Sequence, residues 1–522
     1  MTVDEAALDG IFANLDQGSL PGAAVGVALN GRPVYRKGFG LASMELPIVL
    51  SPTLRMRIGS VTKHFTCAAY LLLCRDGDVG IDDPVGRFLP EVSDVTRKVT
   101  VRQLMGHVSG LRDAHDIVWQ FNGSGHPVSS PDVLSIYRNL ADVNAEPGIT
   151  WIYNNGGFVL LSALIEHICQ QSLETVLQQR IFEPTRMSDT LLRRWDTDFV
   201  PHSASLHMTQ LGGGYQRSYL GTALAGEGGI VSTVDDMLRW LAQMDAPVIG
   251  DRAMWETLTQ PLELANGTST GYGLGLRTRT YRGVKTVGHA GGVMGGSSQI
   301  FKVPAAGLDV VILVNRHDVS AAALAESVLD ACVADLEPIK PRRAVRGSTG
   351  LYCSAASGRV VQLSVQENRQ MAAIDGVDME MEPDAAGVMW SVGPFAHLQQ
   401  GVISKGDSER PASIRLSDFG NVEALESVDT ASEPNPGAFL GHYEAMAVKA
   451  HAVVCEGAKG PELHTRGPFG STQYTLTRLG KNIWRACSRE VMPWGGILVI
   501  NEQCDGFRFS TGRLRGLPFR KV

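Results

Sequence analysis

Four residues, Ser60-Val61-Thr62-Lys63, form the pattern in this sequence that can most directly do chemistry. A serine hydroxyl is a poor nucleophile until a base takes its proton. Lys63 lies three residues after Ser60, on the same face of a helix, so its amine can reach that hydroxyl. The S-x-x-K spacing is common by chance, but here the strand-like RMRIG precedes it and the apolar stretch HFTCAAYLLL follows it. We therefore predict Ser60 as a nucleophile and Lys63 as its base.

A second polar group, Tyr153-Asn154-Asn155, follows the turn signal Pro147-Gly148. Tyr153 could carry a proton between Ser60 and a leaving group. Asn155 could bind a substrate carbonyl. Taken alone, this segment is more typical of a turn with a packed aromatic side chain.

A third group, His289-Ala290-Gly291-Gly292, lies within the strand-like stretch 284–301. Glycines let a substrate backbone lie close to the edge of a strand. A backbone N–H in this group could complete an oxyanion hole with the N–H of Ser60. Alone, HAGG is more typical of a glycine-rich turn.

Other polar clusters are weaker candidates, and we expect no metal or cofactor. The histidines at 107, 115 and 126 are spaced too irregularly for a persuasive metal site. The eight cysteines are scattered without a C-x-x-C pair, which argues against a zinc site or a disulfide framework. The glycines at 212–214 lack the strand and helix that flank a nucleotide-binding loop.

The elements around these groups predict an α+β domain over residues 1–336. An Asn-Gly turn at 30–31 joins residues 23–29 and 32–40 into a hairpin. Helices are expected at 4–16, 60–75 and 321–336, and mainly helices and loops between 80 and 260. Further strands are expected at 272–278, 284–289, 297–304 and 308–315. Strands from both ends of the domain with helices between them indicate one antiparallel sheet flanked by helices.

Two Pro-containing connectors, 337–348 and 431–437, divide the rest of the chain. Gly350-Leu351-Tyr352 opens the first part and Gly441-His442-Tyr443 opens the second, each followed by alternating strand-like segments. This weak repeat predicts two small antiparallel β-barrels, at 349–430 and 438–522.

Composition sets limits on function. The 522 residues carry a net charge of −7 and no basic block, which argues against nucleic acid or an anionic membrane as a partner. No apolar run approaches the roughly 20 residues that span a bilayer. The start, MTVDEAALDGIF, lacks the basic region of a secretory signal, so we expect a cytoplasmic protein.

The three polar groups, in this order and about 93 and 136 residues apart, resemble the penicillin-binding-protein and serine β-lactamase superfamily, whose nucleophile lies in an S-x-x-K motif. The stretches 100–113, 146–166, 226–240 and 272–276 are also similar to that family. The resemblance implies Ser60 as nucleophile and Lys63 with Tyr153 as the proton-handling pair. It also implies Asn155 and His289 as polar groups of the site and Gly292, after Gly291, as an oxyanion donor.

The third group departs from the Lys-Thr-Gly of the penicillin-processing members. His289 replaces the lysine, which removes an anchor for a substrate carboxylate because neutral imidazole attracts it weakly. A His-x-Gly motif with two C-terminal barrels of lipocalin-like type instead resembles the bacterial D-aminopeptidases. That resemblance implies release of an N-terminal D-amino acid from peptides or amides, a homodimer, and β-lactams as inhibitors.

In the D-aminopeptidases a loop of the last barrel enters the cleft, and its carboxylate binds the substrate's amino group. The equivalent stretch here, 487–497, is shorter and lacks the expected aspartate. Glu490 is the carboxylate that could replace it, although a solvated surface acid is the simpler interpretation.

We therefore predict a serine hydrolase that acts through an acyl-enzyme on a small peptide or amide, most simply a D-aminopeptidase. A carboxylesterase, amidase or β-lactamase on the same scaffold is the competing enzyme. A non-catalytic penicillin-recognising protein is the alternative from another class.

Overall fold

Six strands from the two ends of the N-terminal region form one antiparallel sheet, in the order β10-β11-β12-β13-β1-β2. The bounds are β1 Ala23–Leu29, β2 Arg32–Phe39, β10 Arg277–Tyr281, β11 Val284–Val293, β12 Gly296–Val303 and β13 Leu308–Val314. The computed structural model describes residues 3–77, 79–123, 125–210, 212–339, 347–404, 409–431, 439–488 and 495–522.

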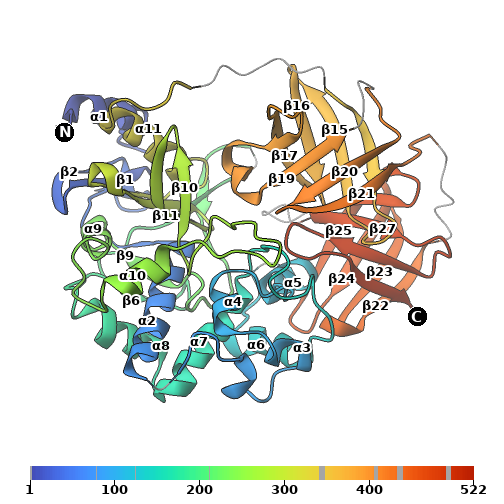
Figure 1. Cartoon of the computed structure of the whole chain (residues 1–522), viewed down its shortest axis with the longest axis horizontal. Coiled ribbons are helices and arrows are strands. Elements are labelled where there is room, and N and C mark those ends of the chain that lie inside the picture. The colour runs from blue at the N-terminus through green and yellow to red at the C-terminus, as the bar shows by residue number, and fades with distance from the viewer. Residues whose placement is uncertain are drawn as a thin grey trace.

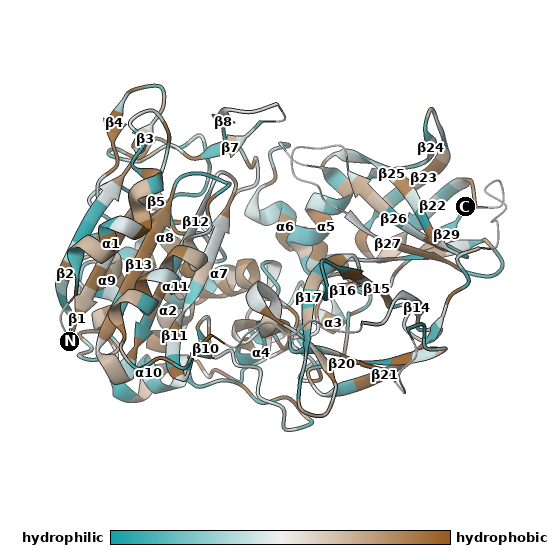
Figure 2. Cartoon of the chain, turned by 90° about the horizontal axis from the view of Figure 1, so that it is seen from above, coloured by the Kyte–Doolittle hydropathy of each residue, from teal (hydrophilic) through white to brown (hydrophobic). Residues whose placement is uncertain are grey.

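The central strand β13 is apolar throughout because both of its faces are covered. Val310, Ile312 and Val314 pack in one cluster with helices α1 (Glu5–Phe12) and α11 (Ala321–Cys332). Val311 and Leu313 point to the opposite face, as alternation along a strand requires, and join the larger core. Helix α9 (Val234–Ala242) contacts β1 and β13, and Figure 2 shows the brown, hydrophobic β13 among these elements.

Helix α2 (Thr62–Asp76) runs through the middle of the helical region, and every residue from Thr62 to Leu73 is buried. Helices α7 Gly156–Cys169, α8 Leu173–Leu177 and α10 Arg252–Thr259 contact it. The same region contains α4 Val101–Met105, α5 Ala114–Asn122 and α6 Ser130–Asn139, which pack on α7. A small antiparallel sheet, β5 Met56–Arg57, β9 Ile230–Ser232 and β6 Leu191–Leu192, leads into α2. The fold thus places Ser60 at the junction of this sheet and the helical region.

The C-terminal part forms two closed, eight-stranded antiparallel barrels, as the sequence predicted. The first contains β14 Gly350–Cys353, β15 Val360–Gln366, β16 Arg369–Ile374, β17 Val377–Pro383, β18 Met389–Ser391, β19 Gln400–Ser404, β20 Ser413–Asp418 and β21 Asn421–Ser427. The second contains β22 Gly441–Ala445, β23 Ala450–Gly457, β24 Gly460–Arg466, β25 Ser471–Gly480, β26 Ile483–Ser488, β27 Gly495–Ile500, β28 Gly506–Ser510 and β29 Leu517–Lys521. Closure leaves neither barrel with an open sheet edge.

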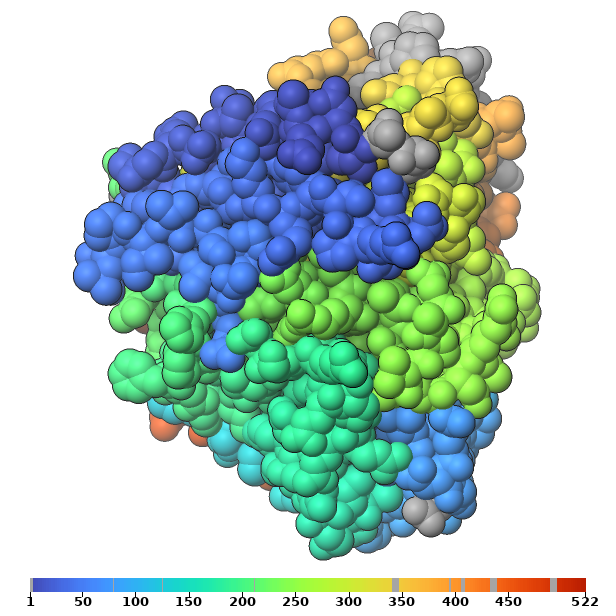
Figure 3. Space-filling model, turned by 90° about the vertical axis from the view of Figure 1, so that its left-hand side faces the viewer, coloured from blue at the N-terminus to red at the C-terminus, as the bar shows by residue number. Residues whose placement is uncertain are grey.

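Both barrels pack on the same side of the N-terminal domain (Figure 1). Helix α5 contacts β24 and β25 of the second barrel, and the Tyr474 hydroxyl donates to the Gln120 carbonyl oxygen at 2.5 Å. The Asn421 amide of the first barrel donates to the Ile149 carbonyl at 2.7 Å. In Figure 3, which views the opposite side, the blue N-terminal residues lie directly above the green middle part of the chain.

Several sequence predictions are confirmed and others are corrected. The hairpin turns at Asn30 and Gly31, both with positive φ as a type I′ turn requires. The strand expected at 272–278 is wrong, because Gly275 has φ +73 and β10 begins only at Arg277. Helix α2 begins two residues later than expected, after a 3₁₀ turn at Gly59–Val61. Most of both connectors, 340–346 and 432–437, lies outside the described residues.

Within the part of the chain that the structure describes, no helix is long and apolar enough to cross a membrane.

We predict that Gly26 in β1 sets how closely α9 can approach the sheet. A Cβ at this position would lie 2.3 Å from Val234 Cγ1 and 3.0 Å from Leu238 Cδ1. Gly26→Ala should therefore lower the free energy of unfolding by about 1–3 kcal/mol through overpacking. Gly10→Ala in α1, where a Cβ meets nothing within 4 Å, should raise it by about 0.5–1 kcal/mol. Thermal unfolding of both variants checks this, and an unchanged midpoint for Gly26→Ala would contradict it.

Candidate active site

Ser60 lies in the 3₁₀ turn that enters α2, where a glycine allows the β11 backbone to come close. Gly59 has φ +52, a conformation that favours glycine. A Cβ on Gly59 would lie 2.8 Å from the Gly292 carbonyl oxygen and 3.0 Å from its nitrogen. The main chain of Gly292 therefore borders the turn that carries Ser60.

Lys63 is completely buried, and its amine contacts three oxygens from three segments. Nζ lies 3.2 Å from Ser60 Oγ, 2.8 Å from Asn155 Oδ1 and 2.6 Å from the Glu227 carbonyl oxygen. Asn155 and Glu227 can only accept at these atoms. The amine is thus held by two acceptors from other segments at hydrogen-bonding distance from the Ser60 hydroxyl.

The two asparagines after Tyr153 have different tasks. Asn154 is buried in the fold, where its amide donates to Leu111 O at 3.0 Å and its Oδ1 accepts from Gly157 N. Asn155 precedes α7 and directs Oδ1 at Lys63, so only its Nδ2 could meet a substrate carbonyl. The structure thus brings Asn155 to the predicted nucleophile and base.

Tyr153 lies beside Lys63, with Nζ 4.8 Å from the centre of its ring. The Tyr153 hydroxyl is buried and has no hydrogen-bond partner among the described residues. The ring is fixed by neighbours, since His107 packs 4.3 Å away and Trp151 6.0 Å away, centre to centre. The hydroxyl is therefore held beside Lys63 with its hydrogen-bonding capacity unused by the described residues.

His289 lies in β11 with both ring nitrogens already in contact. Nε2 is 2.9 Å from the Tyr272 hydroxyl and Nδ1 is 2.5 Å from the Ala290 carbonyl oxygen. Burial, with the nearby Lys63 charge, lowers the pKa of His289 well below its ordinary value, while burial raises that of Tyr272. The tautomer with a protonated Nδ1 satisfies both contacts. His289 is thus a neutral positioning group rather than a free anion-binding cation.

The glycines after His289 meet different surroundings. A Cβ on Gly291 would lie 2.0 Å from the Ile58 carbonyl oxygen and 2.3 Å from Ser298 Oγ. Gly292 is exposed, and a Cβ there meets nothing within 4 Å. Gly291 lets β11 pack against the residues before Ser60, and Gly292 exposes its backbone beside the turn that carries Ser60.

Sequence reasoning missed several groups that complete the site. His107 accepts a hydrogen bond from the Asn154 N–H at 3.1 Å, and burial lowers its pKa well below the ordinary value. Trp151 lies between Tyr153 and Phe419 of the first barrel. The stretches that contain His107 and Glu227 resembled the family, but no spacing signal assigned these residues a role.

The second barrel also reaches the site. Arg513, in the loop between β28 and β29, places its guanidinium 5.1 Å from the centre of the Tyr153 ring. No signal in the sequence singled out this residue. Glu490, the candidate replacement for the carboxylate of the D-aminopeptidase loop, lies outside the described residues.

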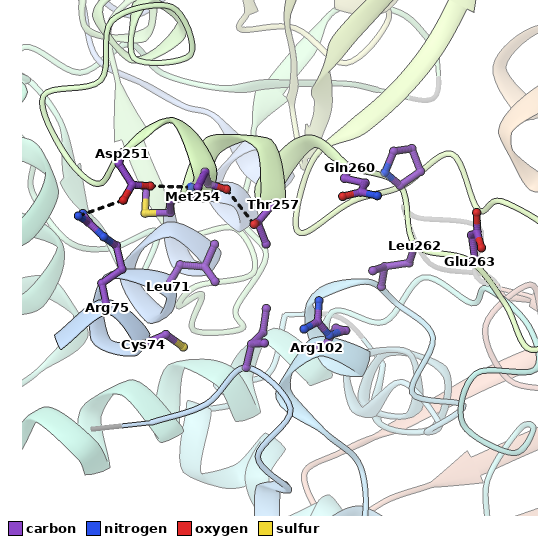
Figure 4. A pocket seen from close by; sticks show the side chains of 13 residues that line it. Leu71, Cys74, Arg75, Arg102, Asp251, Met254, Thr257, Gln260, Leu262 and Glu263 are labelled. Atoms are coloured by element: carbon purple, nitrogen blue, oxygen red, sulfur yellow. Dashed lines mark hydrogen bonds and ion pairs between the residues drawn. The ribbon is translucent and has the colours of Figure 1, made fainter. Parts of the chain in front are cut away.

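A separate pocket of about 720 Å³ lies at the far end of α2 (Figure 4). Its lining includes Leu71, Cys74 and Arg75, and Arg75 pairs with Asp251 at 3.2 Å. Leu71 is eleven residues beyond Ser60, about 16 Å along a helix. Burial raises the pKa of Cys74 to about 11, so it is no ready nucleophile. This pocket is distinct from the site around Ser60.

Comparisons with known proteins show the family of this chain. The family model "Beta-lactamase" matches residues 8–333. A D-aminopeptidase of Cereibacter sphaeroides is 27% identical over the full length of both chains. One of Brucella canis is 29% identical over 370 residues, 69% of each chain.

Solved structures share the fold. An octameric penicillin-binding protein homologue from Pyrococcus abyssi is 21% identical, with a TM-score of 0.59 over 81% of this chain and 100% of its own. The D-amino acid amidase from Ochrobactrum anthropi SV3 is 23% identical, with a TM-score of 0.54 over 63% of this chain and 98% of its own.

We predict that Gly291→Ala lowers kcat/KM by about 100-fold, because the new Cβ must displace β11 from Ile58 and shift the oxyanion donor. Gly292→Ala keeps its backbone N–H and adds a Cβ in open space, so it should lose less than about tenfold. Steady-state kinetics on an activated ester compares the two variants. A larger loss in Gly292→Ala than in Gly291→Ala would contradict this account of the two glycines.

Proposed function

Because this chain belongs to the beta-lactamase family, we propose that it is a serine hydrolase that forms an acyl-enzyme on Ser60. The single observation that carries this proposal is the buried Lys63 amine 3.2 Å from Ser60 Oγ. Two further acceptors fix that amine, so its lone pair has one direction left. A hydroxyl paired with a positioned base is the general signature of an activated nucleophile.

The proposed reaction begins when Lys63 takes the Ser60 proton and Oγ attacks an amide carbonyl carbon. The oxyanion lies between the N–H groups of Ser60 and Gly292. The C–N bond then breaks, and the amine leaves with a proton supplied through Tyr153. Water hydrolyses the ester on Ser60 and releases the acid.

For the substrate, we infer a D-aminoacyl peptide or amide. The relatives named D-aminopeptidase support this class, and the one from Cereibacter sphaeroides aligns along the whole chain, both barrels included. His289 also supports it, because a neutral imidazole with both nitrogens engaged offers little to the carboxylate that a lysine would bind.

We expect Ser60 to be the residue that a β-lactam or fluorophosphonate modifies, since its hydroxyl is the one beside a buried base. Intact-protein mass spectrometry should show one adduct, and peptide mapping should place it on Ser60. Ser60→Ala should abolish both the adduct and turnover. Full activity in Ser60→Ala, or an adduct at another residue, would remove Ser60 from the mechanism.

Lys63→Ala and Tyr153→Phe should each lower kcat by about two to four orders of magnitude, the typical effect of losing a positioned proton carrier. Tyr153→Phe keeps the ring that packs against His107, so its loss reports the hydroxyl alone. Pre-steady-state kinetics separates acylation from hydrolysis of the acyl-enzyme. An unchanged kcat in Tyr153→Phe would assign leaving-group protonation to another group.

The substrate class is tested with D- and L-aminoacyl p-nitroanilides, their N-blocked forms, short esters and a chromogenic cephalosporin. A D-aminopeptidase should favour the free D-aminoacyl anilides. Preference for esters or for the cephalosporin would replace this substrate class and leave the Ser60 chemistry intact.

A further inference from the structure

The loop from Thr511 to Gly516, which we call the arginine loop, joins β28 to β29 of the second barrel. Its Arg513 is the one residue of the loop whose charged group lies over the Tyr153 ring. The loop therefore carries a cation from the last barrel to the group proposed to protonate the leaving amine.

The arginine loop is held by specific contacts. Thr511 Oγ1 donates to Asp116 Oδ2 at 2.7 Å and accepts from the N–H groups of Arg513 and Leu514. Asn144 donates to the Arg513 carbonyl at 2.7 Å and accepts from the N–H of residue 515 at 2.9 Å. These contacts bind the loop to the catalytic domain, so the position of Arg513 is set by structure on both sides.

A second contact fixes the loop to the first barrel. Arg515 pairs with Asp418 at 2.8 Å, and its carbonyl accepts from Arg112 Nη1 at 3.0 Å. All three domains therefore meet at this loop. Such a junction is more than is needed to close a hairpin, and it places the Arg513 guanidinium between the Tyr153 ring and the Asp113 carboxylate.

The Arg513 guanidinium keeps most of its hydrogen-bonding capacity for a ligand. Its nearest described carboxylate is Asp113, with 3.7 Å between Nη1 and Oδ2, too long for a hydrogen bond. Asp113 is completely buried, whereas the Arg513 side chain is 36% exposed. A guanidinium has five N–H donors in a planar fork that matches a carboxylate.

A second guanidinium lies beside the same aromatic cluster. Arg277 lies over the rings of Trp151 and Tyr272, at 5.4 and 5.7 Å, and burial lowers its pKa to about 10. Within the described residues no carboxylate pairs with Arg277. Arg277 and Arg513 thus place two guanidinium groups beside the aromatic cluster of Tyr153, of which Arg513 has a carboxylate, Asp113, at 3.7 Å.

We propose that Arg513 binds a carboxylate carried by the leaving group of the substrate, so that the enzyme favours D-aminoacyl peptides with a free carboxylate over neutral amides. This inference rests on the proposed function and specifies its substrate. Tyr153 marks the leaving-group side, and Arg513 lies on that ring. In a dipeptide, one carbon separates the leaving nitrogen from the carboxylate, so both groups can meet this pair.

The first test compares D-alanyl-glycine with D-alanyl-glycinamide, which differ in the charge of the leaving group. The native enzyme should show a kcat/KM at least about tenfold higher for the carboxylate, a typical effect of a charge-assisted contact. Arg513→Gln should bring the ratio close to one, and Arg513→Lys should give an intermediate ratio because it keeps the charge and loses the fork. The exposed Arg520→Gln of the same barrel is the matched control, with the native ratio.

The native enzyme alone also decides the question if Arg513→Gln does not fold. A ratio near one in the native protein, or a ratio that Arg513→Gln leaves unchanged, would overturn the proposal. D-glutamyl and D-glutaminyl amides place the charge on the acyl side. If the native enzyme prefers D-glutamyl over D-glutaminyl amide by more than it prefers D-alanyl-glycine over D-alanyl-glycinamide, the proposal is also overturned. Arg513 would then bind a carboxylate of the acyl group and not of the leaving group.

A pair of esters separates this proposal from the substrate class on which it rests. Acetate esters of 3-hydroxybenzoate and of 3-hydroxybenzamide have no D-amino acid and differ in leaving-group charge. The native enzyme could fail to hydrolyse D-peptides and still prefer the carboxylate ester, with the preference lost in Arg513→Gln. The D-aminopeptidase class would then be wrong, while the role of Arg513 in binding a leaving-group carboxylate would stand. Equal rates on the two esters in native protein would count against Arg513.

Discussion

The completely buried amine of Lys63 is the constraint on which the rest of the site depends. A buried amine needs partners for its N–H bonds, since an unpaired polar group in the interior is costly. Here Asn155 and the Glu227 carbonyl supply them, from the segment before α7 and from the loop before β9. Because both acceptors come from other parts of the chain, the amine can aim at Ser60 only when the helical region and the small sheet are assembled around α2.

The two barrels complete the site from its open side. The first barrel supports Trp151 through Phe419, and Trp151 in turn packs against Tyr153. The second barrel places Arg513 over the Tyr153 ring. The loop that carries Arg513 is fixed by a hydrogen bond to Asp116. The candidate residues Ser60, Lys63 and Tyr153 therefore lie in one domain, while the two barrels supply groups that pack around Tyr153. This division explains how a shared hydrolase fold can serve different substrates.

The departures from sequence expectation have local physical causes. The 272–276 segment looks like a strand because Tyr, Leu and Leu alternate with glycine, but its Gly275 has a left-handed φ and packs against His64 of α2. His289 was expected to face a substrate, yet Tyr272 and a backbone carbonyl use both of its nitrogens. In each case a contact with another segment outweighed the local pattern. The periodicity of the sequence does not encode such contacts.

The sequence by itself determined the pairing of Ser60 with Lys63, because the two residues are one helical turn apart and their approach needs only local geometry. It also determined the antiparallel sheet and the two barrels, since alternation and turn residues are local signals. Only the tertiary structure decided what surrounds that pair. The Glu227 carbonyl, the His107 ring on Tyr153 and the Arg513 guanidinium come from separate parts of the chain. Their positions follow from the packing of whole domains. Contacts between residues far apart in the chain produce no regular spacing in the sequence from which they could be predicted.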